Sequence, residues 1–130
     1  MSSVFTKIMQ GELPGHFVCE DDIAVAFMSI NPITEGHTLV VPRQETDHWI
    51  DLPPEINAHL MNVAQRIGTA QQKIFNPERI GIIVAGFEVP HMHIHVLPVN
   101  SMDDFSFANA ATRADPEALT TTAQKIHSHL

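Results

Sequence analysis

The sequence contains little cysteine and little positive charge. Its single cysteine, Cys19, cannot form an internal disulfide, which argues against a small secreted domain held together by cross-links. Seven Lys and Arg residues stand against 15 Asp and Glu residues, so the net charge is −8. An acidic chain repels the backbone of a long nucleic acid, whereas a small anion responds mainly to the donors of its own pocket. We therefore expect no long nucleic acid as a partner.

Long apolar runs are also missing. Crossing a bilayer takes roughly 20 consecutive apolar residues, and even the apolar run 82–85 ends at Gly86 and Glu88. The first residues lack the basic and apolar pattern of a secretory signal. We expect a cytoplasmic protein with no membrane partner. The 130 residues, 44% of them hydrophobic, have the size and composition of one domain.

The spacing of apolar residues predicts the secondary structure. From Ile56 to Ile74 apolar residues recur in steps of 3 or 4, which predicts a long helix over 53–75. Ser3 and the pair Asp115-Pro116 are typical helix starts, and they predict a short N-terminal helix and a C-terminal helix ending near 129. Apolar runs bounded by turn residues predict strands over 17–20, 23–28, 38–41, 80–84 and 91–99. This order predicts an α+β domain around a mainly antiparallel five-stranded sheet.

Three histidines, His91, His93 and His95, alternate with apolar residues between Pro90 and Pro98. A strand directs alternate side chains to opposite faces. We therefore expect the three imidazoles on one face of the sheet and the apolar residues between them in the core.

Chance, a surface histidine ladder and a metal site compete with a catalytic interpretation of this pattern. His91 and His95 lie roughly 13 Å apart along a strand, whereas the ligand atoms of tetrahedral zinc lie about 3 to 3.5 Å from one another. All three therefore cannot share one ion. Two of the three histidines could bind a metal together with His37 or Cys19, but the sequence contains no Cys-x-x-Cys or His-Glu-x-x-His pattern to support such a site. We predict no metal and no cofactor.

Imidazole chemistry at phosphorus fits the pattern better. An imidazole that attacks a phosphate forms a phosphoramidate that is stable enough to form and labile enough to hydrolyse. Neighbouring histidines can donate hydrogen bonds to the non-bridging and leaving oxygens. The cluster therefore favours phosphoryl or nucleotidyl transfer.

The segment His91–Leu97 resembles the His-φ-His-φ-His-φ-φ signature, φ being apolar, of the histidine triad (HIT) superfamily. The segments Val4–Ile8, Glu20–Asp22 and Gly36–Pro42 follow in the order and spacing of that family. The resemblance covers about residues 3–105, and the chain looks like the branch of small nucleotide hydrolases and transferases that work as homodimers. It implies a HIT-like fold, with the histidine triad domain over 1–107 and a C-terminal helical extension of the same domain over 108–130.

The resemblance also implies roles for single residues. His93 would attack the α-phosphate and form a nucleotidyl-histidine intermediate that water hydrolyses. The backbone of His91 would help to orient the His93 ring, and His95 and His37 would lie against the phosphate or the leaving group. The expected substrate is a nucleoside phosphoramidate or related mononucleotide derivative, with purine nucleotides favoured. Six residues match positions that bind the nucleotide in this family: Phe5, Ile8, Phe27, Ser29, Ile30 and Val89. For the apolar ones, packing in the core is the alternative.

Three departures from the family pattern keep a second function open. Ser29 stands where many relatives have an Asp that binds the ribose, Phe87 where many have a Gln, and Glu88 adds negative charge near the expected phosphate. A nucleotide-binding sensor or interaction protein without turnover is therefore the alternative. Arg79 and Arg113 are expected to be surface charges.

The resemblance further implies a homodimer. The long helix over 53–75 and the strand over 79–85 would meet their twins across a two-fold interface. A monomer whose C-terminal helix covers the same surface is the alternative.

Overall fold

The computed structural model describes residues 2–112 and 114–130, so Arg113 lies outside the described residues. A short helix is followed by a hairpin, a third strand, a long helix, two more strands and a last helix. The helices are α1 (Val4–Met9), α2 (Pro54–Phe75) and α3 (Pro116–Ser128). The strands are β1 (Phe17–Glu20), β2 (Ala24–Met28), β3 (Thr38–Pro42), β4 (Arg79–Ile83) and β5 (Ile94–Val99). Within the described residues, no helix is long and apolar enough to span a membrane.

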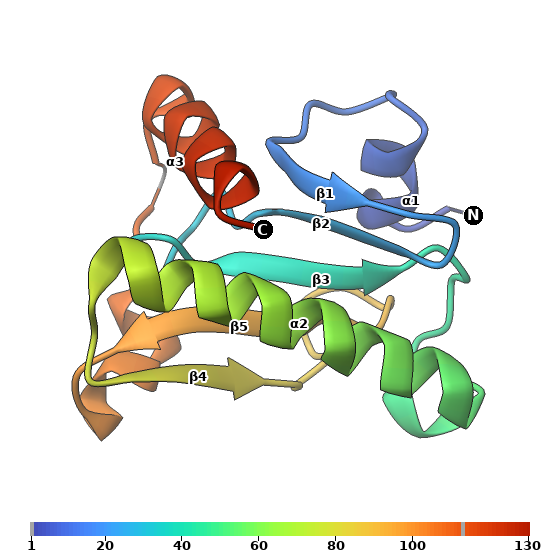
Figure 1. Cartoon of the computed structure of the whole chain (residues 1–130). Coiled ribbons are helices and arrows are strands. Elements are labelled where there is room, and N and C mark those ends of the chain that lie inside the picture. Colours follow the sequence, from blue (N-terminus) through green and yellow to red (C-terminus); the bar gives the residue numbers. More distant parts are fainter. Residues whose placement is uncertain (1, 113) are drawn as a thin grey trace.

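The strands form one sheet in the order β1-β2-β3-β5-β4, and every neighbouring pair is antiparallel. Helix α2 crosses one face of this sheet over β3, β5 and β4, and α3 lies beside it near β1 (Figure 1). The predicted α+β fold with its antiparallel five-stranded sheet is confirmed.

The sheet has a hydrophobic layer on each face, because successive side chains of a strand point to opposite faces. One layer joins Ala26, Val40 and Ile94 to the buried stripe of α2 and to Leu119 of α3. The predicted stripe of α2 is thus the one that packs on the sheet. The opposite face carries two smaller clusters, one under α1 and one under the segment after β5.

Strand β5 begins at Ile94, so the predicted start at His91 is wrong. Strand β3 ends at Pro42, and its register with β5 would bring Pro42 opposite Met92. Proline has no N–H to donate to the ladder, and the N–H of Met92 donates instead to the carbonyl of Thr46 at 2.7 Å. The alternation nevertheless continues through this segment, because Met92 and Ile94 both lie in the α2-side core.

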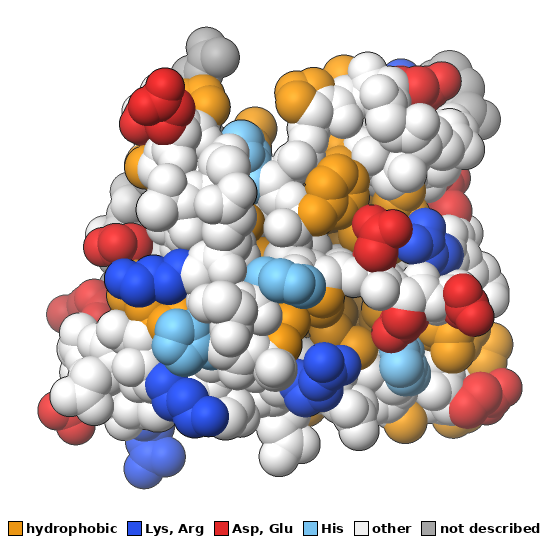
Figure 2. Space-filling view, turned by 45° about the horizontal axis from the view of Figure 1, so that its top comes forward, with side chains coloured by type: hydrophobic (Ala, Val, Ile, Leu, Met, Phe, Trp, Pro, Cys, Tyr) orange, Lys and Arg blue, Asp and Glu red, His pale blue; other side chains and the backbone are white. Residues whose placement is uncertain are grey.

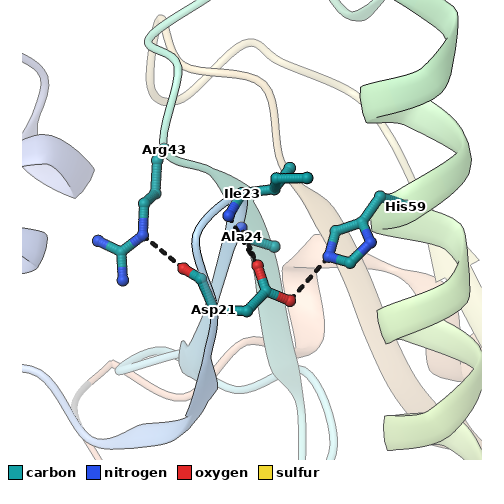
Figure 3. Close-up of polar contacts among 5 residues, drawn as sticks. All are labelled: Asp21, Ile23, Ala24, Arg43 and His59. Carbon is teal, nitrogen blue, oxygen red and sulfur yellow. Dashed lines mark hydrogen bonds and ion pairs between the residues drawn. The ribbon is translucent and has the colours of Figure 1, made fainter.

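The β1–β2 turn is tied to α2 and to the end of β3. Asp21 Oδ1 accepts the backbone N–H groups of Ile23 and Ala24, and Oδ2 lies 2.7 Å from His59 Nε2 on α2. Arg43 donates from Nε to the Asp21 carbonyl at 2.7 Å, on the side opposite His59 (Figure 3). Burial would raise the pKa of Asp21, but the two amides and His59 together lower it. This cluster joins three separate elements.

Basic and acidic side chains are interspersed on the face shown in Figure 2, rather than gathered by sign. Arg79, at the start of β4, is exposed, as expected of a surface charge.

Candidate active site

The three histidines of the signature lie on the sheet face opposite α2 and are all buried. His95 is in β5 opposite Leu39, while His91 and His93 lie in the irregular segment directly before β5. The ring of Phe5, from α1, lies edge-on to His91 and His93, with centroids 5.7 and 4.9 Å away. The structure thus brings the three imidazoles to one face and covers His91 and His93 with α1.

His93 has a defined proton arrangement. Its Nδ1 lies 2.7 Å from the backbone carbonyl oxygen of His91. A carbonyl oxygen can only accept a hydrogen bond, so Nδ1 carries the proton and Nε2 of the neutral ring keeps its lone pair. Burial lowers the pKa of His93, against smaller opposing effects of the His91 carbonyl and of Glu88. The ring is therefore a neutral base at pH 7.

His37 and His95 form a buried pair whose protons are ordered in the same way. The backbone N–H of Ile33 donates to His37 Nδ1 at 3.0 Å, so the neutral His37 ring carries its proton on Nε2. That Nε2 lies 2.9 Å from His95 Nδ1 and donates to it. His95 must then carry its own proton on Nε2.

Burial also lowers the pKa of both histidines in this pair. Burial, with a smaller effect of His93, lowers the pKa of His37 to about 4. Burial and the neighbouring His37 and His93 lower the pKa of His95 to about 3. Both rings are therefore neutral at pH 7, and the His95 ring presents an N–H donor rather than a charge.

The turn before His37 is held by a buried side chain. Gly36 has φ +93°, and a Cβ there would come within 2.5 Å of the Phe75 ring. The amide nitrogen of Gln71 donates to the carbonyls of Gly36 and Val96, at 2.9 and 3.0 Å. This contact links α2 to the start of β3 and to β5, so it fixes where His37 enters the site.

A hollow of about 290 Å³ borders His93. The residues lining it include Asp47, His48, Trp49, Phe87, Met92 and His93. Trp49 is 48% exposed and Phe87 is 96% exposed, so the rim carries aromatic surface. Among the described residues that line the hollow, none is Lys or Arg.

The structure brings four of the six expected nucleotide-binding residues together. Phe5 and Phe27 are buried with ring centroids 5.4 Å apart, and Ile8 and Val89 pack against the same cluster. Ser29 and Ile30 follow the end of β2 instead. The Ser29 hydroxyl accepts the N–H of Asn31 at 3.3 Å, and the side chain of Ile30 is 60% exposed.

Comparison with known proteins agrees with this geometry. The HIT domain family model matches residues 10–102. The chain belongs to the HIT family. An HIT-like protein of Mycobacterium tuberculosis is 38% identical over 123 residues, covering 90% of this chain and 85% of that protein. Adenosine 5′-monophosphoramidase of Saccharomyces cerevisiae is 31% identical over 96 residues, 73% of this chain and 61% of the yeast protein.

The same fold is present in a solved HIT structure. The crystal structure of the Hit-like protein involved in cell-cycle regulation from Bartonella henselae superposes with a TM-score of 0.85. It has 28% sequence identity and covers 99% of this chain and 97% of that one.

Three side chains around the HIT signature were not predicted to be part of the site. Ser3 was expected only to cap a helix, yet its Oγ lies 2.6 Å from His91 Nδ1. Glu45 contacts Ser3 and Thr6, and the ring of Phe107 lies edge-on to His95 at 5.3 Å. No local pattern could have indicated these contacts, because their partners are far apart in the sequence.

Proposed function

We propose that this HIT protein hydrolyses a nucleoside phosphoramidate or related mononucleotide derivative through a nucleotidyl-histidine intermediate on His93. The observation that carries this proposal is the hydrogen bond from His93 Nδ1 to the His91 carbonyl, which leaves the Nε2 lone pair free in a site that opens to solvent. The name of the yeast relative, a monophosphoramidase, supports a phosphorus–nitrogen bond as the target.

In the proposed reaction, the His93 Nε2 lone pair attacks the α-phosphorus. The phosphorus–nitrogen bond breaks, and its electron pair leaves with the amine, which takes a proton from solvent. His93 keeps its Nδ1 proton, so the His91 carbonyl accepts a hydrogen bond from an increasingly positive ring. The N–H at His95 Nε2 donates to a phosphoryl oxygen. Water then attacks phosphorus and loses a proton to solvent, the electron pair of the phosphorus–nitrogen bond returns to Nε2, and the nucleoside monophosphate leaves.

The apolar cluster of Phe5, Ile8, Phe27 and Val89 supports a binding site for the base, because it adjoins His93 through the Phe5 ring. An aromatic and aliphatic wall suits the face of a purine. Ser29 can offer the ribose a hydroxyl but no charge. Phe5 is 6% and Phe27 2% exposed, so base binding would use their exposed edges and the partly buried Ile8 and Val89.

The hollow beside His93 supports an amine over a polyphosphate as the leaving group. Its described lining includes Asp47 and aromatic surface from Trp49 and Phe87, but neither Lys nor Arg. A polyphosphate would bring negative charge to this lining without a paired cation. An amine, above all a cationic or aromatic one, fits such a wall better.

A substrate panel followed by mass spectrometry tests this function. We expect adenosine phosphoramidates to be hydrolysed, and a nucleotidyl mass to appear on His93 after rapid quenching. Dinucleoside polyphosphates should react more slowly. Tight binding of a nucleoside monophosphate with neither adduct nor product would contradict the proposal and favour the sensor.

We also propose that two copies associate through α2 and β4. Strand β4 is an edge of the sheet, and a groove of about 510 Å³ runs between it and α2. Met61 and Ile82, both in the groove, are 47% and 45% exposed. An apolar groove beside a free sheet edge is a surface that a second copy would cover.

Replacing Ile82 by glutamate is expected to turn this dimer into a monomer, because the two-fold axis would bury two carboxylates. Light scattering at micromolar concentration measures the change from about twice 14.4 kDa to 14.4 kDa. Thr121→Glu, on an exposed position of α3, is the control and should stay dimeric. A wild-type mass near 14.4 kDa would contradict the dimer.

A further inference from the structure

A hydrogen-bond network joins the exposed carboxylate of Glu45 to the buried ring of His91. Glu45 Oε1 accepts the backbone N–H of Ser3 and the hydroxyl of Thr6, each at 2.7 Å. The Ser3 hydroxyl accepts the backbone N–H of Thr6 at 3.1 Å and lies 2.6 Å from His91 Nδ1. On the other side of the ring, His91 Nε2 lies 2.8 Å from the Pro42 carbonyl. Residues from three separate parts of the chain thus meet at one imidazole.

The protons in this network have one consistent arrangement. The Pro42 carbonyl can only accept, so His91 carries its proton on Nε2 and its Nδ1 is an acceptor when the ring is neutral. Ser3 then donates its hydroxyl proton to His91, and Thr6 donates its own to Glu45. Burial lowers the pKa of His91, against smaller opposing effects of Pro42 and Glu45, so the ring is neutral at pH 7. The hydrogen bond from Ser3 lowers the pKa of Glu45, which is therefore ionised.

We propose that Ser3 and Glu45 are positioning residues for His93: Glu45 anchors Ser3, Ser3 holds one tautomer and orientation of His91, and the His91 carbonyl in turn orients His93. This inference rests on the proposed function, because it assigns the network a part in the same reaction. The His91 ring is held at both nitrogens, and its own backbone carbonyl is the acceptor for His93 Nδ1. Rotation of the His91 residue would therefore move the acceptor that keeps the His93 proton on Nδ1.

A helix cap alone does not account for this arrangement. Capping α1 requires the Ser3 oxygen to accept the Thr6 N–H, and that leaves the direction of the hydroxyl proton open. The tautomer that the Pro42 carbonyl imposes on His91 directs this proton away from the helix, to a buried nitrogen 88 residues later in the sequence. The two functions of Ser3 can be separated experimentally, because glycine is nearly as good an N-cap as serine but has no hydroxyl.

The test compares Ser3→Gly, Ser3→Thr and Glu45→Gln with the wild-type protein. For hydrolysis of an adenosine phosphoramidate, Ser3→Gly should lower kcat about 3- to 10-fold with little change in KM, the effect of losing one neutral hydrogen bond in the site. Ser3→Thr keeps the hydroxyl and should retain near wild-type kcat. Glu45→Gln should give a smaller loss, because its amide oxygen still accepts but carries no charge.

Lys7→Gly is the matched control, since it weakens α1 at an exposed position outside the network. Long-range ¹H–¹⁵N correlation spectra provide a second readout, independent of activity. In the wild-type protein His91 should show a protonated Nε2 and His93 a protonated Nδ1. Ser3→Gly should shift the Nδ1 signal of His91, which loses its donor, and the signals of His93.

The inference is overturned if Ser3→Gly keeps both kcat and the wild-type histidine signals, or if Lys7→Gly lowers kcat as much as Ser3→Gly does. A wild-type protein without turnover would contradict the proposed function instead, and the tautomer measurement would then decide the positioning by itself.

Discussion

Replacing His93 by alanine is expected to lower the turnover of an adenosine phosphoramidate by about three orders of magnitude or more, because it removes the attacking atom of a covalent mechanism. The loss should appear in kcat, since the cluster around Phe27 and Val89 stays in place to bind the nucleotide. Quenched-flow mass spectrometry should find no nucleotidyl adduct on the variant. His129→Ala, an exposed position near the C-terminus, is the control and should retain turnover.

A second variant separates loss of the nucleophile from damage to the fold. His93→Gly leaves a space of imidazole shape beneath Phe5, whose ring lies 4.9 Å from that of His93. Added imidazole should therefore restore part of the rate. Full turnover of His93→Ala in the absence of added imidazole would assign the chemistry to another residue and refute the nucleotidyl-histidine intermediate.

Lowering the pH from 7 to 4 is expected to remove several kcal/mol from the free energy of unfolding, a large part of the 5–15 kcal/mol typical of a domain. The reason is the buried pair His37 and His95. The unfolded chain takes up these protons near pH 6.5, whereas the folded protein takes them up only near pH 4 and pH 3. Between those values the unfolded state binds more protons, so acid favours unfolding.

Each of the two histidines contributes at most about 1.4 kcal/mol per pH unit in this window. The lowered pKa of Asp21 acts in the same direction, but only below its ordinary value of 3.8. Urea denaturation at pH 7, 6, 5 and 4 measures the slope, and His37→Gln should reduce it because one titrating group is lost. A free energy of unfolding that stays constant from pH 7 to 5 would contradict this prediction, because it would show that the folded protein takes up these protons as readily as the unfolded chain does.

The sequence by itself determined the features that depend on periodicity and on local turn chemistry. The stripe from Ile56 to Ile74 predicted α2, because helical spacing places these residues on one side whatever they pack against. Alternation predicted which face of β5 carries His95, and Pro116 after Asp115 predicted the start of α3. The triad pattern also identified the family, since its order of polar and apolar residues is itself local.

Only the tertiary structure decided the protonation and surroundings of the histidines. The start of β5 depended on a proline in β3, which neighbours it in the sheet but not in the sequence. The tautomers of His37 and His95 depend on the N–H of Ile33, and that of His91 on the carbonyl of Pro42, 49 residues away. A ring nitrogen donates or accepts according to the partner that folding brings to it, and burial in a low-dielectric interior then keeps the ring neutral. The residues next to the histidines in the sequence reveal neither the partner nor the burial.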